Sequence, residues 1–262
     1  MTHIDAQRIQ RYYKIKQRGA LIDNALASTR SLGMLMSDAL RDAACEQYLV
    51  LRDAKVASIN VALEAGLALL RGAAAGGAAL EYTIAGRTVT RMAEVSESQA
   101  HVGRWLDIFE AASVVRDRAA LATLCAVPLE VVLGSSTAAE PFQQHWVRFL
   151  HTFAATGRFA PDLLMRAMKA TDPNGLLEDV RDYALYVVVP TMHLYYQIAV
   201  KSSGGFEQAA GEALEKHERY WSRADQAHVA TGFISWPISA AVSIATERGV
   251  AERVASPYVI DL

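Results

Sequence analysis

Apolar residues recur at intervals of three and four positions along most of this chain, which is the spacing of the buried face of an α-helix. The clearest run lies between about residues 32 and 70 and comprises Leu35, Ala39, Ala43, Val56, Ile59, Leu63, Leu67 and Leu70. Alanine is abundant and only 7 of the 262 residues are proline, which favours closely packed helices. The pattern predicts two helices over this run, with a break between Cys45 and Leu51.

One segment departs from the helical spacing. Residues 80–84 and 87–92 alternate β-branched, aromatic and polar side chains on either side of Ala85-Gly86. This alternation predicts a β-hairpin at about residues 80–92, in which Gly86 supplies the positive φ of a tight turn. We therefore expect an all-α, multi-helix domain with one small β-hairpin and a short extended C-terminal tail at about residues 253–259.

Capping signals mark where further helices begin. Ser96 and Gln99 have the spacing of a capping box before a helix that contains Trp105. Asp117 is placed to accept hydrogen bonds from the first amides of the next helix, and Pro141 stands where a helix needs no N–H donor.

Proline and glycine mark further boundaries. Pro190 is expected to kink or break its helix, and Gly249 to end the last one. The sequence has no Pro/Ser-rich linker and no repeat with a fixed period of about 34 or 40 residues, so we predict a single domain over residues 1–262.

Composition and charge limit the partners. The formal net charge is −2, whereas binding to nucleic acid phosphates requires a basic excess, so no nucleic acid partner is expected. Cys45 and Cys125 lie far apart without a CxxC motif and are predicted to be buried free thiols of a reducing compartment. The polar N-terminus lacks the apolar segment of a secretory signal, and we expect a cytoplasmic protein.

Two uncharged runs, residues 184–200 and 229–246, approach the roughly 20 apolar residues that a membrane span needs. Each contains proline and several polar side chains, so both are predicted to be central helices of a bundle and not membrane spans.

The sequence offers no recognisable constellation for catalysis. It has no His-Glu-x-x-His motif, no pair of Glu-x-x-His motifs and no Gly-x-Ser-x-Gly elbow. His145, His151 and His193 fall within apolar helices, where a hydrogen-bonded core histidine is the usual role. We predict no catalytic residues, no metal site and no cofactor.

Two alternatives remain open. A helical enzyme would need a pocket between the region from Tyr183 to Gln197 and the last helix, in which His193 and a carboxylate converge. Packing of the tyrosines against neighbouring helices is favoured over this alternative. A regulator that binds a small molecule would need an apolar pocket and a DNA-reading helix. The candidate for the DNA-reading helix is the first helix of the chain. Its outer side is expected to be basic and to carry Arg8, Arg11, Lys14, Lys16 and Arg18.

Acidic side chains gather in the second half of the chain. The predicted partner-binding residues are Glu178, Asp179, Asp182, Glu212 and Glu215. Such a cluster attracts a basic partner over long distances and speeds encounter, although single members are also typical of an ordinary solvated helix face.

Four stretches, in this order, resemble the immunity protein 49 family of bacterial polymorphic toxin systems. They are the hairpin, the segment from Trp105-Leu106-Asp107 to Leu124, the segment from Phe206 through Ala213-Leu214, His217 and Tyr220-Trp221, and the last helix ending Thr246-Glu247-Arg248-Gly249 before Tyr258. Together they span most of residues 80–260; the first 75 residues resemble the family only in being helical.

The resemblance implies an all-α antidote that neutralises a toxin, often a nuclease, by binding it stoichiometrically. It assigns structural roles to its motif residues, namely Trp105, Asp117, His217, Tyr220, Trp221, Gly249 and Tyr258. Because the surface that contacts the toxin varies with the toxin, the resemblance carries over no contact residues. The oligomeric state stays open.

Overall fold

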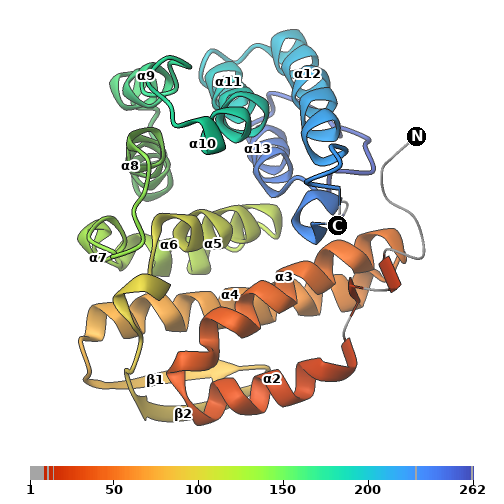
Figure 1. Ribbon diagram of the computed structural model, residues 1–262. Helices are drawn as coiled ribbons and strands as arrows, with labels where there is room; N and C mark the ends of the chain where they lie inside the picture. The colour runs from red at the N-terminus through yellow and green to blue at the C-terminus, as the bar shows by residue number, and fades with distance from the viewer. Residues whose placement is uncertain (1–8, 11, 14, 228, 261) are drawn as a thin grey trace.

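The computed structural model describes residues 9–10, 12–13, 15–227, 229–260 and 262, and these form helices with one two-stranded hairpin. The lower part of Figure 1 holds the N-terminal layer, which consists of α2 (Ile15–Ala27), α3 (Leu32–Tyr48), α4 (Arg52–Ala75), β1 (Ala79–Ile84) and β2 (Arg87–Met92). The predicted all-α fold with one small hairpin is confirmed.

The remaining helices stack above this layer. They are α5 (Val102–Val114), α6 (Arg118–Ala126), α7 (Leu129–Leu133), α8 (Pro141–Thr156), α9 (Pro161–Lys169), α10 (Glu178–Tyr183), α11 (Val189–Ala199), α12 (Ser203–Trp221) and α13 (Trp236–Glu247). Short 3₁₀ turns add Thr29–Ser31, Glu97–Gln99 and Ala230–Phe233, and Ala184–Val188 forms a π turn. The chain after α13 has no helix or strand among its described residues, as predicted for the tail.

Helices α3 and α4 pack side by side along their length, and the break that the sequence left between Cys45 and Leu51 falls at residues 49–51. The amide of Val50 donates to the carbonyl of Gln47, and that of Leu51 to the carbonyl of Glu46. This paired bonding ends a helix with a left-handed residue, usually glycine. Here Val50 takes that conformation, with φ of 55°.

The hairpin pairs Ala79 with Met92 and Ile84 with Arg87, close to the predicted boundaries. Ala85 and Gly86 both have positive φ, 50° and 76°, which a two-residue turn of this hand requires. Alternate residues of β1 are buried, and the strand packs on α4. Tyr82 also donates its hydroxyl to the carbonyl of Ala25 at 2.6 Å, which fixes the hairpin to α2.

A buried ionic network joins α2 to α3. The Arg18 guanidinium binds Asp42 and Glu46, each at 3.0 Å, and both carboxylates are almost fully buried. Tyr13 and Ser58 also donate to Glu46. The prediction that Arg18 lies on a basic outer side is wrong, because two buried carboxylates need its charge. Arg8, Arg11, Lys14 and the side chain of Lys16 lie outside the described residues.

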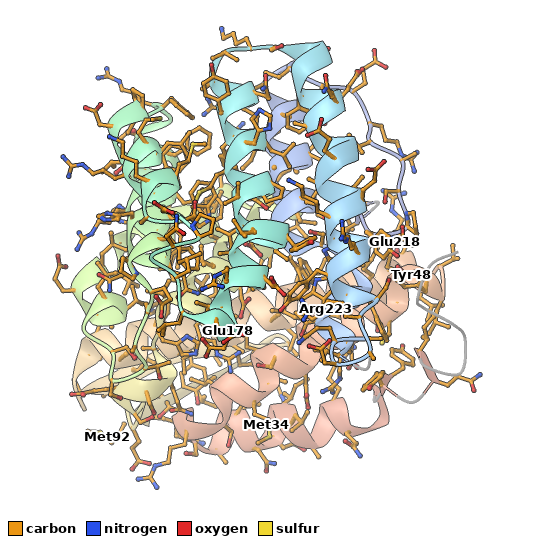
Figure 2. All side chains as sticks on the ribbon, turned by 45° about the horizontal axis from the view of Figure 1, so that its top comes forward. Met34, Tyr48, Met92, Glu178, Glu218 and Arg223 are labelled. Atoms are coloured by element: carbon orange, nitrogen blue, oxygen red, sulfur yellow. The ribbon has the colours of Figure 1, made fainter. Side chains whose placement is uncertain are left out.

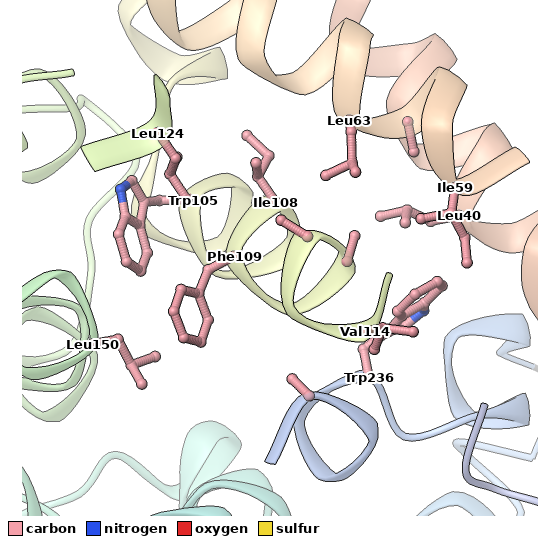
Figure 3. Close-up of a cluster of buried hydrophobic side chains, with 14 of the residues drawn as sticks. Leu40, Ile59, Leu63, Trp105, Ile108, Phe109, Val114, Leu124, Leu150 and Trp236 are labelled. Carbon is pink, nitrogen blue, oxygen red and sulfur yellow. The ribbon is translucent and has the colours of Figure 1, made fainter. Parts of the chain in front are cut away.

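Helix α5 lies between the N-terminal layer and the upper helices, and its side chains are buried in both directions (Figure 3). Ile108 faces α4, where Gly66 leaves room for it, since a Cβ at position 66 would lie 2.6 Å from the Ile108 side chain. Trp105 stacks on Phe109 at 5.5 Å between ring centroids and has no exposed surface. This helix therefore joins the layers into one hydrophobic core.

Helix boundaries follow the capping signals with one difference. Asp117 accepts a hydrogen bond from the Ala120 amide at 2.9 Å at the start of α6, and Pro141 is the first residue of α8. The Ser96 amide donates to the Gln99 side chain at 3.3 Å, but this pair opens a single 3₁₀ turn, and α5 begins only at Val102.

The expected kink at Pro190 takes the form of a π turn. Residues 184–188 form this wider turn immediately before α11, and the helix then continues through Pro190. The wider turn accommodates a residue that cannot donate a backbone hydrogen bond. The predicted end of the last helix is present, since Gly249 has φ of 65° directly after α13.

One helix in the described part of the chain, α4, is long and apolar enough to cross a membrane, and 61% of its most apolar window is buried inside the fold. The apolar runs that the sequence placed in central helices form α11 and α13, both of which are largely buried. Their packing within the bundle accounts for their apolar character.

Candidate functional site

The predicted acidic residues lie on α10 and α12. Glu178 and Asp179 are exposed in the first turn of α10, where the helix dipole stabilises negative charge. Asp182, near the end of α10, forms an ion pair with Arg223, which follows α12. Figure 2 shows Glu178 at the start of α10 and Arg223 beyond the end of α12. Asp182 shares the Arg223 guanidinium with Asp225, whose carboxylate lies 3.4 Å from it.

Glu212 and Glu215 are exposed on α12. Glu212 accepts a hydrogen bond from Gln208, one turn earlier, at 3.0 Å. Because α12 packs against the π turn that continues α10, the two acidic groups belong to neighbouring elements. Glu178, Asp179, Glu212 and Glu215 are thus solvent-exposed on neighbouring elements, and Lys216 and Arg219 lie among the acidic residues of α12. That these acidic residues bind a partner stays a prediction.

The aromatic motif residues of α12 hold the C-terminal tail. His217 is buried, lies 5.1 Å from the Tyr258 ring and bonds to the carbonyl of Gly232 at 3.1 Å. The Trp221 ring lies flat against Gly232, where any Cβ would approach it to 2.4 Å. The carbonyl of Tyr258 in turn accepts from the Ser235 amide at 2.7 Å. These residues therefore position the tail beside the start of α13.

Two carboxylates on α5, Asp107 and Glu110, are partly buried. Burial raises the pKa of Asp107 to about 6, although its side chain keeps some exposure in a cleft that Arg41 and Trp236 also line. Burial and the neighbouring Asp107 raise the pKa of Glu110 well above its usual range. Glu110 and Tyr183 line a cavity of about 30 Å³. This volume has room for about one water molecule.

This cavity bears on the alternative of a helical enzyme. That alternative requires His193 and a carboxylate to converge in a pocket, but His193 bonds to Gln197 at 2.9 Å and does not line the cavity beside Glu110. Small-molecule sites usually occupy about 300–1,000 Å³, far more than this space. Among the described residues, no cluster of three or more His, Cys, Asp or Glu side chains has the arrangement of a metal site.

A broad cleft of about 660 Å³ lies where α5, α8 and α13 end and α6 begins. Its floor is apolar, and its charged lining residues are Arg116, Arg118, Glu247 and Arg248. The Arg248 guanidinium lies over the Phe153 ring, 4.3 Å from its centroid, and donates to the carbonyl of Gly157 at 3.0 Å. Ser113 also lines this cleft, and its buried hydroxyl has no hydrogen-bond partner.

A second cleft, of about 570 Å³, meets the first at Arg116. It lies between the start of α4, the end of α5, α13 and the tail, and Arg52 and Arg253 also line it. Among the described lining residues of both clefts, Glu247 is the one acidic side chain. We call the two together the arginine-lined groove, after Arg52, Arg116, Arg118, Arg248 and Arg253.

Comparison with known proteins identifies the family. The model of the family described as immunity protein 49 matches residues 50–259, which is most of the chain. The chain belongs to the immunity protein 49 family. No curated protein and no solved structure matches the chain.

The match includes all four stretches on which the sequence resemblance to immunity protein 49 rests, and it starts about 30 residues before the first of them. Helix α4 therefore belongs to the shared family region, whereas α2 and α3 precede it. The matched region includes the acidic residues, the aromatic motif and the five arginines of the arginine-lined groove. Gln47, Ile260 and Leu262, which also line the groove, lie outside it.

Sequence reasoning missed the arginine-lined groove. Its arginines lie at positions 52, 116, 118, 248 and 253, separated by long stretches of chain, so no local run of charge reveals them. One local signal lies at the end of α5. The Arg116 amide donates to the carbonyl of Ser113 and the Asp117 amide to that of Ala112, and Arg116 has φ of 57°. Helices that end in this way usually carry glycine at this position, so an arginine there is unusual.

Proposed function

We propose that this protein is a cytoplasmic immunity protein that neutralises a cognate bacterial toxin by binding it stoichiometrically. The observation that carries the proposal is the family match over residues 50–259. The proposal requires no cofactor, metal, nucleic acid or membrane, and it gives the protein no catalytic step. Inhibition follows from covering the toxin's active site or its substrate-binding surface.

The structure supports a role in binding through its exposed charged surfaces on a rigid helical frame. A stable complex buries about 1,200–2,000 Å² and depends on a few desolvated anchors. Both the acidic region of α10 and α12 and the arginine-lined groove are positioned by helices that pack into the common core. Charge on such surfaces increases the rate of encounter with a partner of opposite charge.

Co-expression tests the proposal directly. A toxin domain encoded beside this gene, which the proposal requires, is expressed with and without this chain. Growth is followed, and the molar mass of the purified complex is measured by light scattering. We expect restored growth and a complex of fixed stoichiometry. Restored growth with no complex, or with one molecule of this chain inactivating many toxin molecules, would contradict stoichiometric neutralisation.

Charge reversal tests whether the acidic region contributes. We expect the triple substitution Glu178→Lys, Asp179→Lys and Glu215→Lys to slow association with a basic toxin about tenfold at low salt, because rim charges act mainly on the association rate. Surface plasmon resonance at two ionic strengths measures this. Glu81→Lys, on the exposed face of β1, is the control. An unchanged association rate at low salt would remove the acidic region from the interface.

A further inference from the structure

The arginine-lined groove combines positive charge, apolar surface and an unsatisfied polar group. Its apolar lining includes Phe109, Leu121 and Ile244, and its charged lining includes Arg52, Arg116, Arg118 and Arg248 beside Glu247. Arg118 is largely exposed and lies 3.6 Å from Glu247, a contact that leaves its charge mostly available in water. The hydroxyl of Ser113 is buried in the same cleft without a partner, and an occupant with a hydrogen-bonding group would satisfy it.

The turn between α3 and α4 extends this surface with apolar side chains. Leu49, Val50 and Leu51 are 38%, 87% and 41% exposed, and they lie between Gln47 and Arg52, both of which line the groove. Exposed apolar side chains beside a concave charged surface are typical of an interaction site.

Backbone conformation adds an independent observation. Val50 and Arg116 end α3 and α5 in the left-handed conformation, in which glycine is favoured and a β-branched residue such as valine is especially strained. Each residue lowers the stability of the fold relative to glycine. Arg116 lines the groove, and Val50 lies in the adjacent turn between Gln47 and Arg52. Strain that persists at exposed positions is common where a side chain binds a partner.

We propose that the arginine-lined groove and the adjacent turn at residues 49–51 receive an acidic segment of the cognate toxin, with an apolar side chain of that segment in the cleft floored by Phe109 and Ile244. This inference rests on the proposed function and specifies which surface performs it. Arginine is the favoured residue at such sites because its planar guanidinium binds carboxylates through two parallel hydrogen bonds. The complementary charge of the groove selects a segment rich in Asp and Glu.

The first test reverses charge without harming the fold. Arg52 and Arg118 each stand in the first turn of a helix, so Glu at these positions interacts favourably with the helix dipole. We expect Arg52→Glu with Arg118→Glu to raise the Kd for the toxin domain at least about tenfold and to abolish most of its salt dependence. The control is Arg148→Glu with Arg166→Glu, two exposed arginines away from the groove, which should leave the Kd unchanged.

The second test separates binding from folding. Val50→Gly and Arg116→Gly remove the strain and should raise the melting temperature, while each weakens the toxin complex by about threefold or more. Lys201→Gly is the matched control, because Lys201 ends α11 in the same left-handed conformation, with φ of 54°, and does not line the groove. It should stabilise the fold without changing the Kd.

The outcomes distinguish this inference from the proposed function. If the wild-type protein binds and neutralises the toxin while all groove variants keep the wild-type Kd, the groove proposal is wrong and the immunity function stands. If the wild-type protein does not bind the toxin, both fail. Loss of binding to a labelled DNA duplex, or loss of a dimer in size-exclusion chromatography, in the groove variants with an unchanged toxin Kd would assign the groove to another occupant and overturn the proposal.

Discussion

Gly232 shows how one residue positions the C-terminal part of the molecule. Its backbone lies against the face of the Trp221 ring, and its carbonyl bonds to His217. A side chain at this position has no space, because the nearest ring atom would lie 2.4 Å from the new Cβ. At the residue scale, the absence of a side chain is what lets α12 approach the 3₁₀ turn that precedes α13.

Gly232→Ala is therefore expected to destabilise the protein by about 1–3 kcal/mol, the usual range for an overpacked buried site. Gly211→Ala is the matched control, because Gly211 lies on the exposed side of α12 and an added Cβ would meet nothing within 4 Å. That change should stabilise the helix by about 0.5–1 kcal/mol. Urea denaturation measures both, and equal effects of the two substitutions would contradict the close approach of Trp221.

Asp107 makes stability depend on pH. Because burial raises its pKa in the folded protein to about 6, against about 3.9 in the unfolded chain, the folded state binds more protons between these values. The free energy of unfolding therefore falls as pH rises from about 4 to 6. Above pH 6 the ionised side chain lowers stability by at most about 3 kcal/mol.

Asp107→Asn removes that charge and should stabilise the protein by about 1–3 kcal/mol at pH 7. The gain should shrink toward zero at pH 4, where Asp107 of the folded protein is already neutral. Thermal unfolding at a series of pH values gives the difference, with Glu252→Gln in the exposed tail as the control. A gain that is the same at pH 4 and pH 7 would argue against a raised pKa.

At the scale of elements, the hairpin depends on the alternating pattern of its strands and on a turn whose two residues must have positive φ. Both turn residues have positive φ, but one of them is Ala85, whose amide donates to Glu64 of α4 at 2.7 Å. That bond to α4 compensates in part for the strained alanine. At α5 the local signal and the helix do not coincide. The capping box of Ser96 and Gln99 is present, but α5 itself begins three residues after Gln99.

Ala85→Gly should stabilise the hairpin by about 0.5–1 kcal/mol, because glycine adopts the required conformation without strain and keeps the amide that binds Glu64. Gly86→Ala should have the opposite sign. Guanidinium denaturation detects both changes. A loss of stability in Ala85→Gly would show that the alanine side chain contributes more than its conformation costs.

At the scale of the whole molecule, one hydrophobic cluster runs from α2 to the tail. Helix α5 contacts the N-terminal layer through Ile108 and the upper helices through Phe109 (Figure 3). A core shared in this way makes the layers depend on each other, since neither can keep its buried surface when the other unfolds.

We therefore expect urea to unfold the chain in one transition. Tryptophan fluorescence reports on α5, α8, α12 and α13, whereas far-UV circular dichroism also detects α2–α4, so the two curves should coincide. Two separate transitions, with the N-terminal layer unfolding independently, would contradict the predicted single domain.

The sequence by itself determined the helical class, the hairpin, the break near Val50, the Asp117 cap and the end at Gly249, because these depend on periodicity and on interactions within a few residues. The positions of charges were decided only by tertiary structure. Packing of distant helices buries Arg18 against Asp42 and Glu46, pairs Asp182 with Arg223, and gathers Arg52, Arg116 and Arg248 into one groove. No local pattern encodes such long-range contacts, since they arise when helices cross.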